Sequence, residues 1–269
     1  MSDVFALTSA SRSFFAAAAR RAAVELGLFS ALPCSDQELA ERLGLPSPRL
    51  RPLVRALRKE GLLDPAAALS AAARVSDEGW GRLGEVIRRD RPLDTTAYTC
   101  SWHEHLSQAG EAAAKELAPW LFELDSSHTL LDLGGGLGTY ARPFAALGGR
   151  ATVVDRSEIV AQAKSAAGVT FVADDIFHTD LDGFGVVLLS NVLHLYGAHE
   201  CAQLCMRARQ LGHSVVVKDF DLASSAGTWF AVNMALYTEA GDVHDSAQIA
   251  EWLGGAEIKS LGDHVLIWK

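Results

Sequence analysis

Apolar residues recur along this 269-residue chain with two different spacings. From residue 129 onward, short apolar runs alternate with stretches of helical spacing such as 140–147 and 199–211. Runs that are apolar throughout are typical of strands buried on both faces of a parallel sheet. The predicted strands are 130–133, 152–154, 169–172, 186–189 and 214–217, and two last strands, 256–259 and 264–268, form a ribbon that closes the sheet. The pattern predicts an α/β fold with a doubly wound sheet.

The first part of the chain has helical spacing instead, beginning with one predicted helical stretch over residues 1–33. Ser35 and Glu38 have the spacing of a capping box, which opens a second helix that Gly44 ends. A third helix is predicted over 48–60, and residues 61–63 and 74–79 are predicted to form a hairpin. Three helices followed by a hairpin predict a winged helix at the N-terminus.

The third predicted helix has an apolar side and a basic side. Its inward residues are Leu50, Leu53, Val54 and Leu57, and its outward residues are Arg49, Arg51, Arg55, Arg58 and Lys59. A basic face on a winged helix suggests DNA binding, but a charged helix face is usually just solvated. The formal net charge of −9 also disfavours a general nucleic-acid binder.

Composition narrows the class of protein further. The longest apolar runs are too short to span a bilayer, and the first residues lack the pattern of an export signal. The four cysteines have no paired C-x-x-C spacing, so we expect reduced thiols and a cytoplasmic location. His103 and His105 lie two residues apart on a predicted helix and point to different sides, so no metal site is predicted.

The stretch 129–140 contains the densest glycine cluster, with Gly134, Gly136 and Gly138 following a buried strand and preceding a helix. Such a turn lets the backbone approach a ligand closely. The pyrophosphate fingerprint needs a glycine at position 139, where Thr139 stands. Taken alone, the cluster also fits any turn of a doubly wound sheet.

Acidic residues follow the first three strands in order. Asp132 lies two residues before the first glycine, and Asp155 ends the second strand, seventeen residues past Gly138. An acid at the second position is where a ribose diol is held by charge-assisted hydrogen bonds. After the third strand come Asp174 and Asp175, either of which is by itself more often a helix N-cap than a ligand.

In combination these motifs resemble those of class I S-adenosyl-L-methionine (SAM)-dependent methyltransferases. The N-terminal part also resembles the N-terminal domain of plant-type and bacterial small-molecule O-methyltransferases, in the segments "LGLFSAL", "ELAERLGL" and "LRPLVRALRKEGLL". The resemblance implies a winged-helix dimerisation domain over 1–85, which pairs subunits and does not read DNA. It implies a helical linker over 86–127 that closes over the substrate, and a Rossmann-like seven-stranded SAM domain over 128–269. It implies that SAM is bound by the glycines with Asp132 and Asp155. It places adenine against Asp174 or Asp175, with register favouring Asp174, and against Ile176 and Phe177.

The catalytic pattern of the family is not intact in this sequence. The resemblance places the family's histidine base at Glu200, with a histidine one residue earlier at His199, and places a base-orienting glutamate at Val243. Other candidates follow the fourth strand, where ligands of open α/β sheets bind. These candidates are His194, Tyr196 and Asn191, whose amide can contact SAM or an acceptor.

Three functions are compatible with this altered pattern. The first is methyl transfer to a small, secondary-metabolite-like acceptor with a different base, His199 or Glu200 being nearest. The second is cyclisation of SAM alone, in which its amine displaces methylthioadenosine and forms azetidine-2-carboxylate. The third is a SAM-binding regulator without catalysis.

Overall fold

The computed structural model describes all residues except 1–8, 33, 64–79, 94–98, 262–263 and 269. The chain forms two compact units. One contains Thr96–Asp221 and His244–Lys269, and the other contains Leu7–Thr95 and Leu222–Val243. Among the helices of the described part, none is long and apolar enough to cross a membrane.

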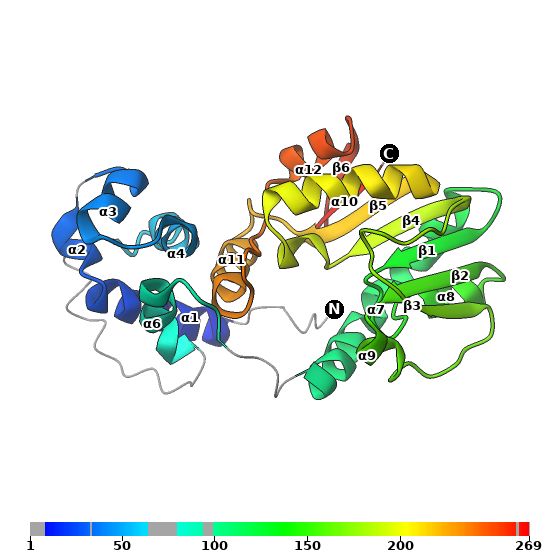
Figure 1. Ribbon diagram of the computed structural model, residues 1–269, viewed down its shortest axis with the longest axis horizontal. Coiled ribbons are helices and arrows are strands. Elements are labelled where there is room, and N and C mark those ends of the chain that lie inside the picture. Colours follow the sequence, from blue (N-terminus) through cyan, green and yellow to red (C-terminus); the bar gives the residue numbers. More distant parts are fainter. Residues whose placement is uncertain (1–8, 33, 64–79, 94–98, 262–263, 269) are drawn as a thin grey trace. The chain divides into compact units, whose positions relative to one another are not determined.

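The first unit is built on a seven-stranded sheet with the order β3-β2-β1-β4-β5-β7-β6 (Figure 1). Its parallel strands are β1 (Thr129–Leu133), β2 (Arg150–Asp155), β3 (Val169–Ala173), β4 (Phe184–Ser190) and β5 (Gly212–Phe220). The closing strands β6 (Glu257–Leu261) and β7 (His264–Trp268) are antiparallel, with β7 paired to β5. The predicted Rossmann-like sheet is confirmed, including its reversed ribbon.

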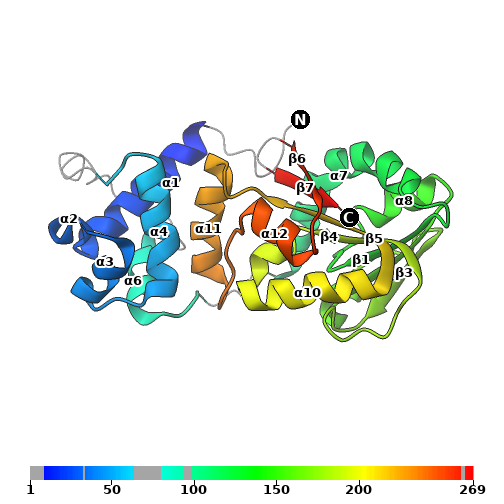
Figure 2. The same ribbon diagram turned by 90° about the horizontal axis from the view of Figure 1, so that it is seen from above.

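Helices cover both faces of this sheet (Figure 2). One face packs on α10 (Ala198–Leu211) and α12 (Ser246–Trp252), and the other packs on α7 (Thr99–Glu123) and α8 (Ala141–Ala146). The short elements α9 (Ser157–Val160) and η2 (Leu193–Leu195) follow β2 and β4. Because the central strands are buried on both sides, they are apolar throughout. The side chains of His103 and His105 lie outside the described residues.

The second unit is helical. It contains α1 (Ser9–Glu25), α2 (Leu28–Ala31), α3 (Asp36–Leu43), α4 (Ser47–Lys59), η1 (Trp80–Arg82), α6 (Leu83–Arg89) and α11 (Ser225–Tyr237). The capping box of Ser35 and Glu38 is confirmed, and Gly44 ends α3 in the left-handed conformation. The predicted hairpin at 74–79 lies outside the described residues. The domain limits at residues 85 and 127 stay a prediction, and the structure groups α11 with the N-terminal helices.

The basic side of α4 is used inside this unit, and the prediction that Arg49 faces outward is wrong. Arg49 is buried and donates to the carbonyl oxygens of Ala235 (2.5 Å) and Thr238 (3.0 Å) at the end of α11. The last carbonyl groups of a helix have no partner within the helix, which explains why they attract a buried guanidinium. Lys59 donates to the backbone carbonyl of Ser224 (2.8 Å), just before α11. Two cations of α4 therefore hold the two ends of α11.

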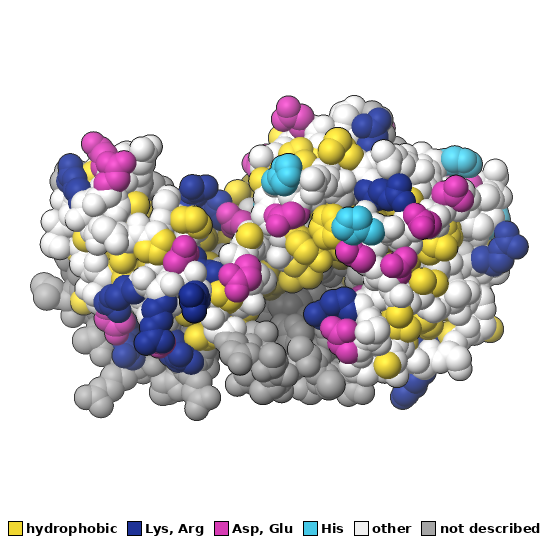
Figure 3. All heavy atoms as spheres, in the orientation of Figure 1, with side chains coloured by type: hydrophobic (Ala, Val, Ile, Leu, Met, Phe, Trp, Pro, Cys, Tyr) yellow, Lys and Arg dark blue, Asp and Glu magenta, His cyan; other side chains and the backbone are white. Residues whose placement is uncertain are grey.

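Two more basic residues of α4 also have partners in the same unit. Arg55 pairs with Asp242 at 2.6 Å, and Arg58 donates to the carbonyl oxygen of Cys34 at 3.0 Å. Figure 3 shows Asp and Glu side chains beside Lys and Arg over the N-terminal helices. Four of the basic residues of α4 thus make contacts within the unit, whereas Arg51 is exposed.

Candidate functional site

The glycine turn after β1 forms the floor of the candidate site. A Cβ atom at Gly135 would lie 2.4 Å from Cγ of Asp132, so a larger residue there cannot be accommodated. Gly136 has a φ of 58°, and a Cβ atom there would meet no atom within 4 Å. Its positive φ explains the glycine, while the open space in front of it lets a ligand approach the backbone.

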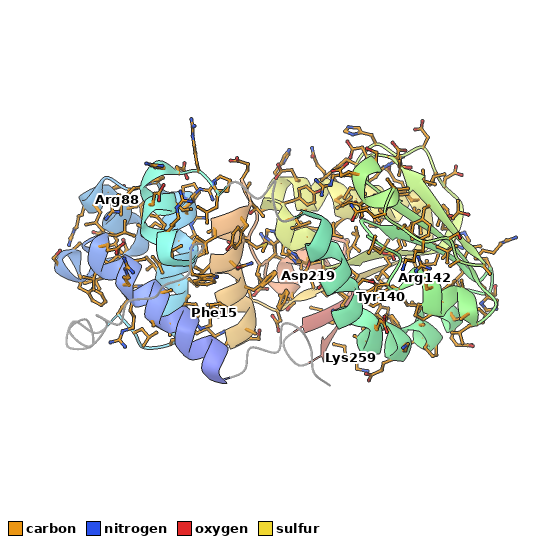
Figure 4. All side chains as sticks on the ribbon, turned by 90° about the horizontal axis from the view of Figure 1, so that it is seen from below. Phe15, Arg88, Tyr140, Arg142, Asp219 and Lys259 are labelled. Atoms are coloured by element: carbon orange, nitrogen blue, oxygen red, sulfur yellow. The ribbon has the colours of Figure 1, made fainter. Side chains whose placement is uncertain are left out.

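Two elements brace this turn from outside. On α8, Arg142 donates to the carbonyl oxygen of Leu137 (3.0 Å) and lies over the ring of Phe171 on β3, 5.5 Å from its centre (Figure 4). On α7, Ser107 accepts a hydrogen bond from the hydroxyl of Thr139 at 3.0 Å. Side chains of α7 and α8 therefore support the backbone of the turn.

Asp132 lies at the end of β1 and is completely buried. Neither carboxylate oxygen has a hydrogen-bond partner among the described residues. Burial, together with the nearby charge of Asp155, raises the pKa of Asp132 to about 7. A buried carboxylate without a partner is costly, so this position favours a cationic or hydrogen-donating ligand.

Asp155 ends β2 beside the same turn. Its Oδ2 accepts from the backbone N–H of Gly136 at 2.8 Å, and its Oδ1 accepts from the N–H of Arg156 at 2.8 Å. A carboxylate has about four acceptor positions, so capacity remains for ligand hydroxyls.

The segment after β3 supplies two carboxylates in different states. Asp175 accepts from the N–H of Phe177 (2.9 Å) and contacts Nδ1 of His178 (2.8 Å), and these hydrogen bonds lower its pKa. Asp174 is exposed, and its Oδ1 accepts from the N–H of Asp175. Asp175 thus has both oxygens engaged within its own turn, whereas Asp174 has one.

An aromatic corner stands next to these acids. The ring of Phe177 meets that of Tyr196 edge-on, with 5.1 Å between the centres, and Ile176 is buried. Burial raises the pKa of the Tyr196 phenol. The corner joins the segment after β3 to the loop after β4.

Asn191 opens that loop in a strained conformation. Its φ is 57°, in the left-handed region that non-glycine residues rarely adopt, and its N–H donates to the carbonyl oxygen of Lys218 at 2.8 Å. Its side-chain Oδ1 is buried without a partner among the described residues, as is the hydroxyl of Ser190. Strain and orphaned polar atoms at one strand end are typical of a binding site.

His194 is paired with the carboxylate of Asp219, which no motif of the sequence had indicated as a site residue. Its Nδ1 lies 2.6 Å from Oδ1 of Asp219 at the end of β5, and both side chains are buried. Asp219 also accepts from the backbone N–H of Phe220 at 2.8 Å, which fixes the carboxylate (Figure 4). The signal in the sequence was the acid that follows the fifth strand.

The two bases nearest to the family pattern are placed differently. His199 is exposed on the first turn of α10. The carboxylate of Glu200 accepts from the N–H of Gly197 at 3.0 Å and so caps the same helix. Val243 is buried. The catalytic roles predicted for His199 and Glu200 stay predictions without supporting geometry.

Comparison with known proteins identifies the family. Residues 93–256, more than half of the chain, match the family described as O-methyltransferase domain. The chain belongs to this O-methyltransferase family. SAM is the methyl donor of such enzymes. The open space at Gly136, the unpartnered oxygens of Asp132 and the remaining acceptor capacity of Asp155 have the chemistry that a ligand with ammonium and hydroxyl groups needs.

Similar proteins include methyltransferases of plants and bacteria. Tabersonine 16-O-methyltransferase of Catharanthus roseus is 24% identical over 236 residues, which cover 78% of this chain and 62% of that protein. The 3-hydroxy-5-methyl-1-naphthoate 3-O-methyltransferase of Streptomyces sahachiroi is 27% identical over 300 residues, covering 89% and 86%. The chain spans less than two thirds of the plant relative.

Solved structures share the fold of this chain. An O-methyltransferase family 2 protein from Planctomyces limnophilus, crystallised with apigenin, matches with a TM-score of 0.76 and 22% identity over 99% of this chain and 95% of that one. Human N-acetylserotonin methyltransferase in complex with SAM matches with a TM-score of 0.57 and 18% identity, covering 97% and 95%.

Proposed function

We propose that this protein transfers the methyl group of SAM to a hydroxyl group of a small aromatic molecule, with His194 as the general base. The observation that carries this proposal is the buried contact of 2.6 Å between His194 and Asp219. A base whose second nitrogen is held by a carboxylate is the arrangement that activates hydroxyl nucleophiles.

The roles of the two residues follow from this contact. Nδ1–H of His194 donates to Asp219, so proton transfer from the acceptor hydroxyl runs through Nε2. The hydroxyl oxygen forms the new bond to the methyl carbon as the sulfur–methyl bond breaks, and the hydroxyl proton moves to His194 and later to water. Asp219 stabilises the imidazolium and keeps the ring oriented.

We assign the groups that bind SAM by their remaining hydrogen-bonding capacity. Asp155 holds the ribose hydroxyls, and Asp174 rather than Asp175 receives the adenine amino group, because the oxygens of Asp175 are already engaged. Ile176 and Phe177 pack against the adenine ring. Asp132 and Asn191 face the amino-acid end of SAM, where their orphaned oxygens accept from its ammonium group.

The acceptor class is proposed from the relatives and from the local chemistry. Two of the relatives named above methylate, by their names, positions on tabersonine and on a hydroxynaphthoate. In this chain Leu195 is exposed next to His194, and Tyr196 on the same loop meets the ring of Phe177, which follows β3. These residues favour an apolar aromatic acceptor over a highly charged one.

The test is incubation with SAM and a panel of phenols and naphthols, scoring S-adenosylhomocysteine by mass spectrometry. We expect acceptor-dependent S-adenosylhomocysteine, and a loss of about 10²–10⁴-fold in turnover in His194→Gln with SAM affinity retained. His199→Gln and Glu200→Gln separate the other candidate bases. A loss confined to either of these variants would overturn the role of His194.

The same incubation without an acceptor distinguishes the other functions. Methylthioadenosine formed from SAM alone would indicate cyclisation, and bound SAM that yields neither product would indicate a regulator. Either outcome would contradict the proposal.

We also propose that the N-terminal helices pair two subunits and bind no nucleic acid. The described apolar residues of α1, including Ala18, Ala19, Ala22 and Ala23, are buried in the core of their own unit, so they do not by themselves require a partner. Light scattering at micromolar concentration tests this point. A monomeric mass would contradict pairing.

A further inference from the structure

The loop that carries His194 contacts a second polar cluster, formed by the buried side chains of Cys201 and His244. Cys201 on α10 lies with its Sγ 3.1 Å from the carbonyl oxygen of Leu193. His244, just before α12, has its Nε2 3.0 Å from the carbonyl oxygen of Tyr196 and 3.2 Å from Sγ of Cys201. The residues on either side of the 194–195 dipeptide are therefore both anchored through their backbone.

The direction of each hydrogen bond in this cluster is fixed by chemistry. A carbonyl oxygen can only accept, so Nε2 of His244 carries the hydrogen that Tyr196 receives, and the thiol of Cys201 donates to Leu193. Burial raises the pKa of the Cys201 thiol, which keeps it protonated and able to donate. The Nε2–H of His244 then lies between two acceptors, the oxygen of Tyr196 and the sulfur of Cys201, so each donor in the cluster has an acceptor.

We infer that His244 is a positioning residue for the catalytic base, acting through the backbone of Tyr196 and the thiol of Cys201. The inference rests on the proposed role of His194. Asp219 contacts both the ring of His194 (2.6 Å) and its backbone N–H (3.3 Å). Cys201 and His244 hold the carbonyl groups of Leu193 and Tyr196 on either side. The contacts of Asp219 and the anchoring of the loop are both needed, because a small displacement of the base breaks its hydrogen bond to the substrate hydroxyl.

The ring of His244 is itself held in place. It meets the indole of Trp252 on α12 edge-on, with 5.2 Å between the ring centres, and its side chain is buried. His244 also follows Val243 directly, the position at which the family resemblance implies a base-orienting glutamate. The carboxylate of Asp219 orients the ring of the base, and the imidazole of His244 holds the backbone of its loop.

The test compares two substitutions that differ only in the donor they retain. His244→Gln keeps an N–H close to the position of Nε2, whereas His244→Leu removes it. We expect His244→Leu to lower kcat about tenfold or more while KM for SAM changes less than about twofold, because the loop and not the cofactor site is released. His244→Gln should restore kcat to within about threefold of the wild type. His213→Gln, an exposed histidine at the opposite end of β5, is the matched control.

A second readout does not depend on activity. The Nδ1 proton that His194 shares with Asp219 gives an NMR resonance, assigned by its disappearance in His194→Gln. We expect it to shift or broaden in His244→Leu and to stay unchanged in His244→Gln. If the wild type methylates nothing, the proposed function fails, and this resonance still tests the positioning role.

Three outcomes would overturn the inference: an unchanged resonance and kcat in His244→Leu, equal losses in the Gln and Leu variants, or a rise in KM for SAM with no change in kcat. If His244→Leu does not fold, Cys201→Ala and Cys201→Ser replace it. Ala removes the donor to Leu193 and Ser keeps it, so we expect the same contrast between these two variants.

Discussion

Replacing Asp219 by Asn tests the catalytic assignment most directly. The change keeps the shape of the side chain but removes the charge that lies 2.6 Å from Nδ1 of His194. A hydrogen bond to a charged group contributes about 1.5–3 kcal/mol, against about 0.5–1.5 kcal/mol for a neutral one. The Asn amide can also donate to Nδ1 and so select the wrong tautomer of the ring.

The two effects together should cost about 3 kcal/mol in the transition state, which corresponds to about a 10²-fold lower kcat. The assay is formation of S-adenosylhomocysteine with saturating SAM and the best acceptor of the panel. KM for SAM and the melting temperature serve as controls for binding and folding. A loss of kcat below about threefold, in a folded protein that binds SAM normally, would refute the role of Asp219.

Three further predictions concern binding and stability. Between about pH 4 and pH 7 the folded protein keeps the proton of Asp132, whereas the unfolded chain has lost it, so the free energy of unfolding should fall by about 4 kcal/mol over this range. Urea unfolding should show this fall in the wild type and not in Asp132→Asn. Asp155→Ala should weaken SAM binding by about 1.5–3 kcal/mol, and unchanged affinity by calorimetry would remove Asp155 from the site. Arg49→Met should destabilise the protein by about 3 kcal/mol in urea unfolding, because carbonyl groups at the end of α11 lose their donor. Arg51 on the same helix is exposed, so Arg51→Met should change stability by less than about 0.5 kcal/mol.

The sequence alone determined the features that depend on neighbouring residues. The strands, the capping box of Ser35 and the glycine turn were predictable because each follows from spacing within a few residues. The order of acids after successive parallel strands indicated one edge of the sheet, since parallel strands bring their carboxyl ends together. Family resemblance then gave the cofactor.

Only the tertiary structure decided which distant groups meet. The partner of His194 lies 25 residues away on β5, and the group that holds Tyr196 lies 48 residues away at His244. Arg49 was assigned to solvent because helical spacing shows which face a residue is on but not what packs there, and the carbonyl ends of α11 come from 186 or more residues away. The family resemblance placed Glu200 and His199 near the base position. The fold uses Glu200 to cap α10 and leaves His199 exposed, and the catalytic roles of both stay predictions.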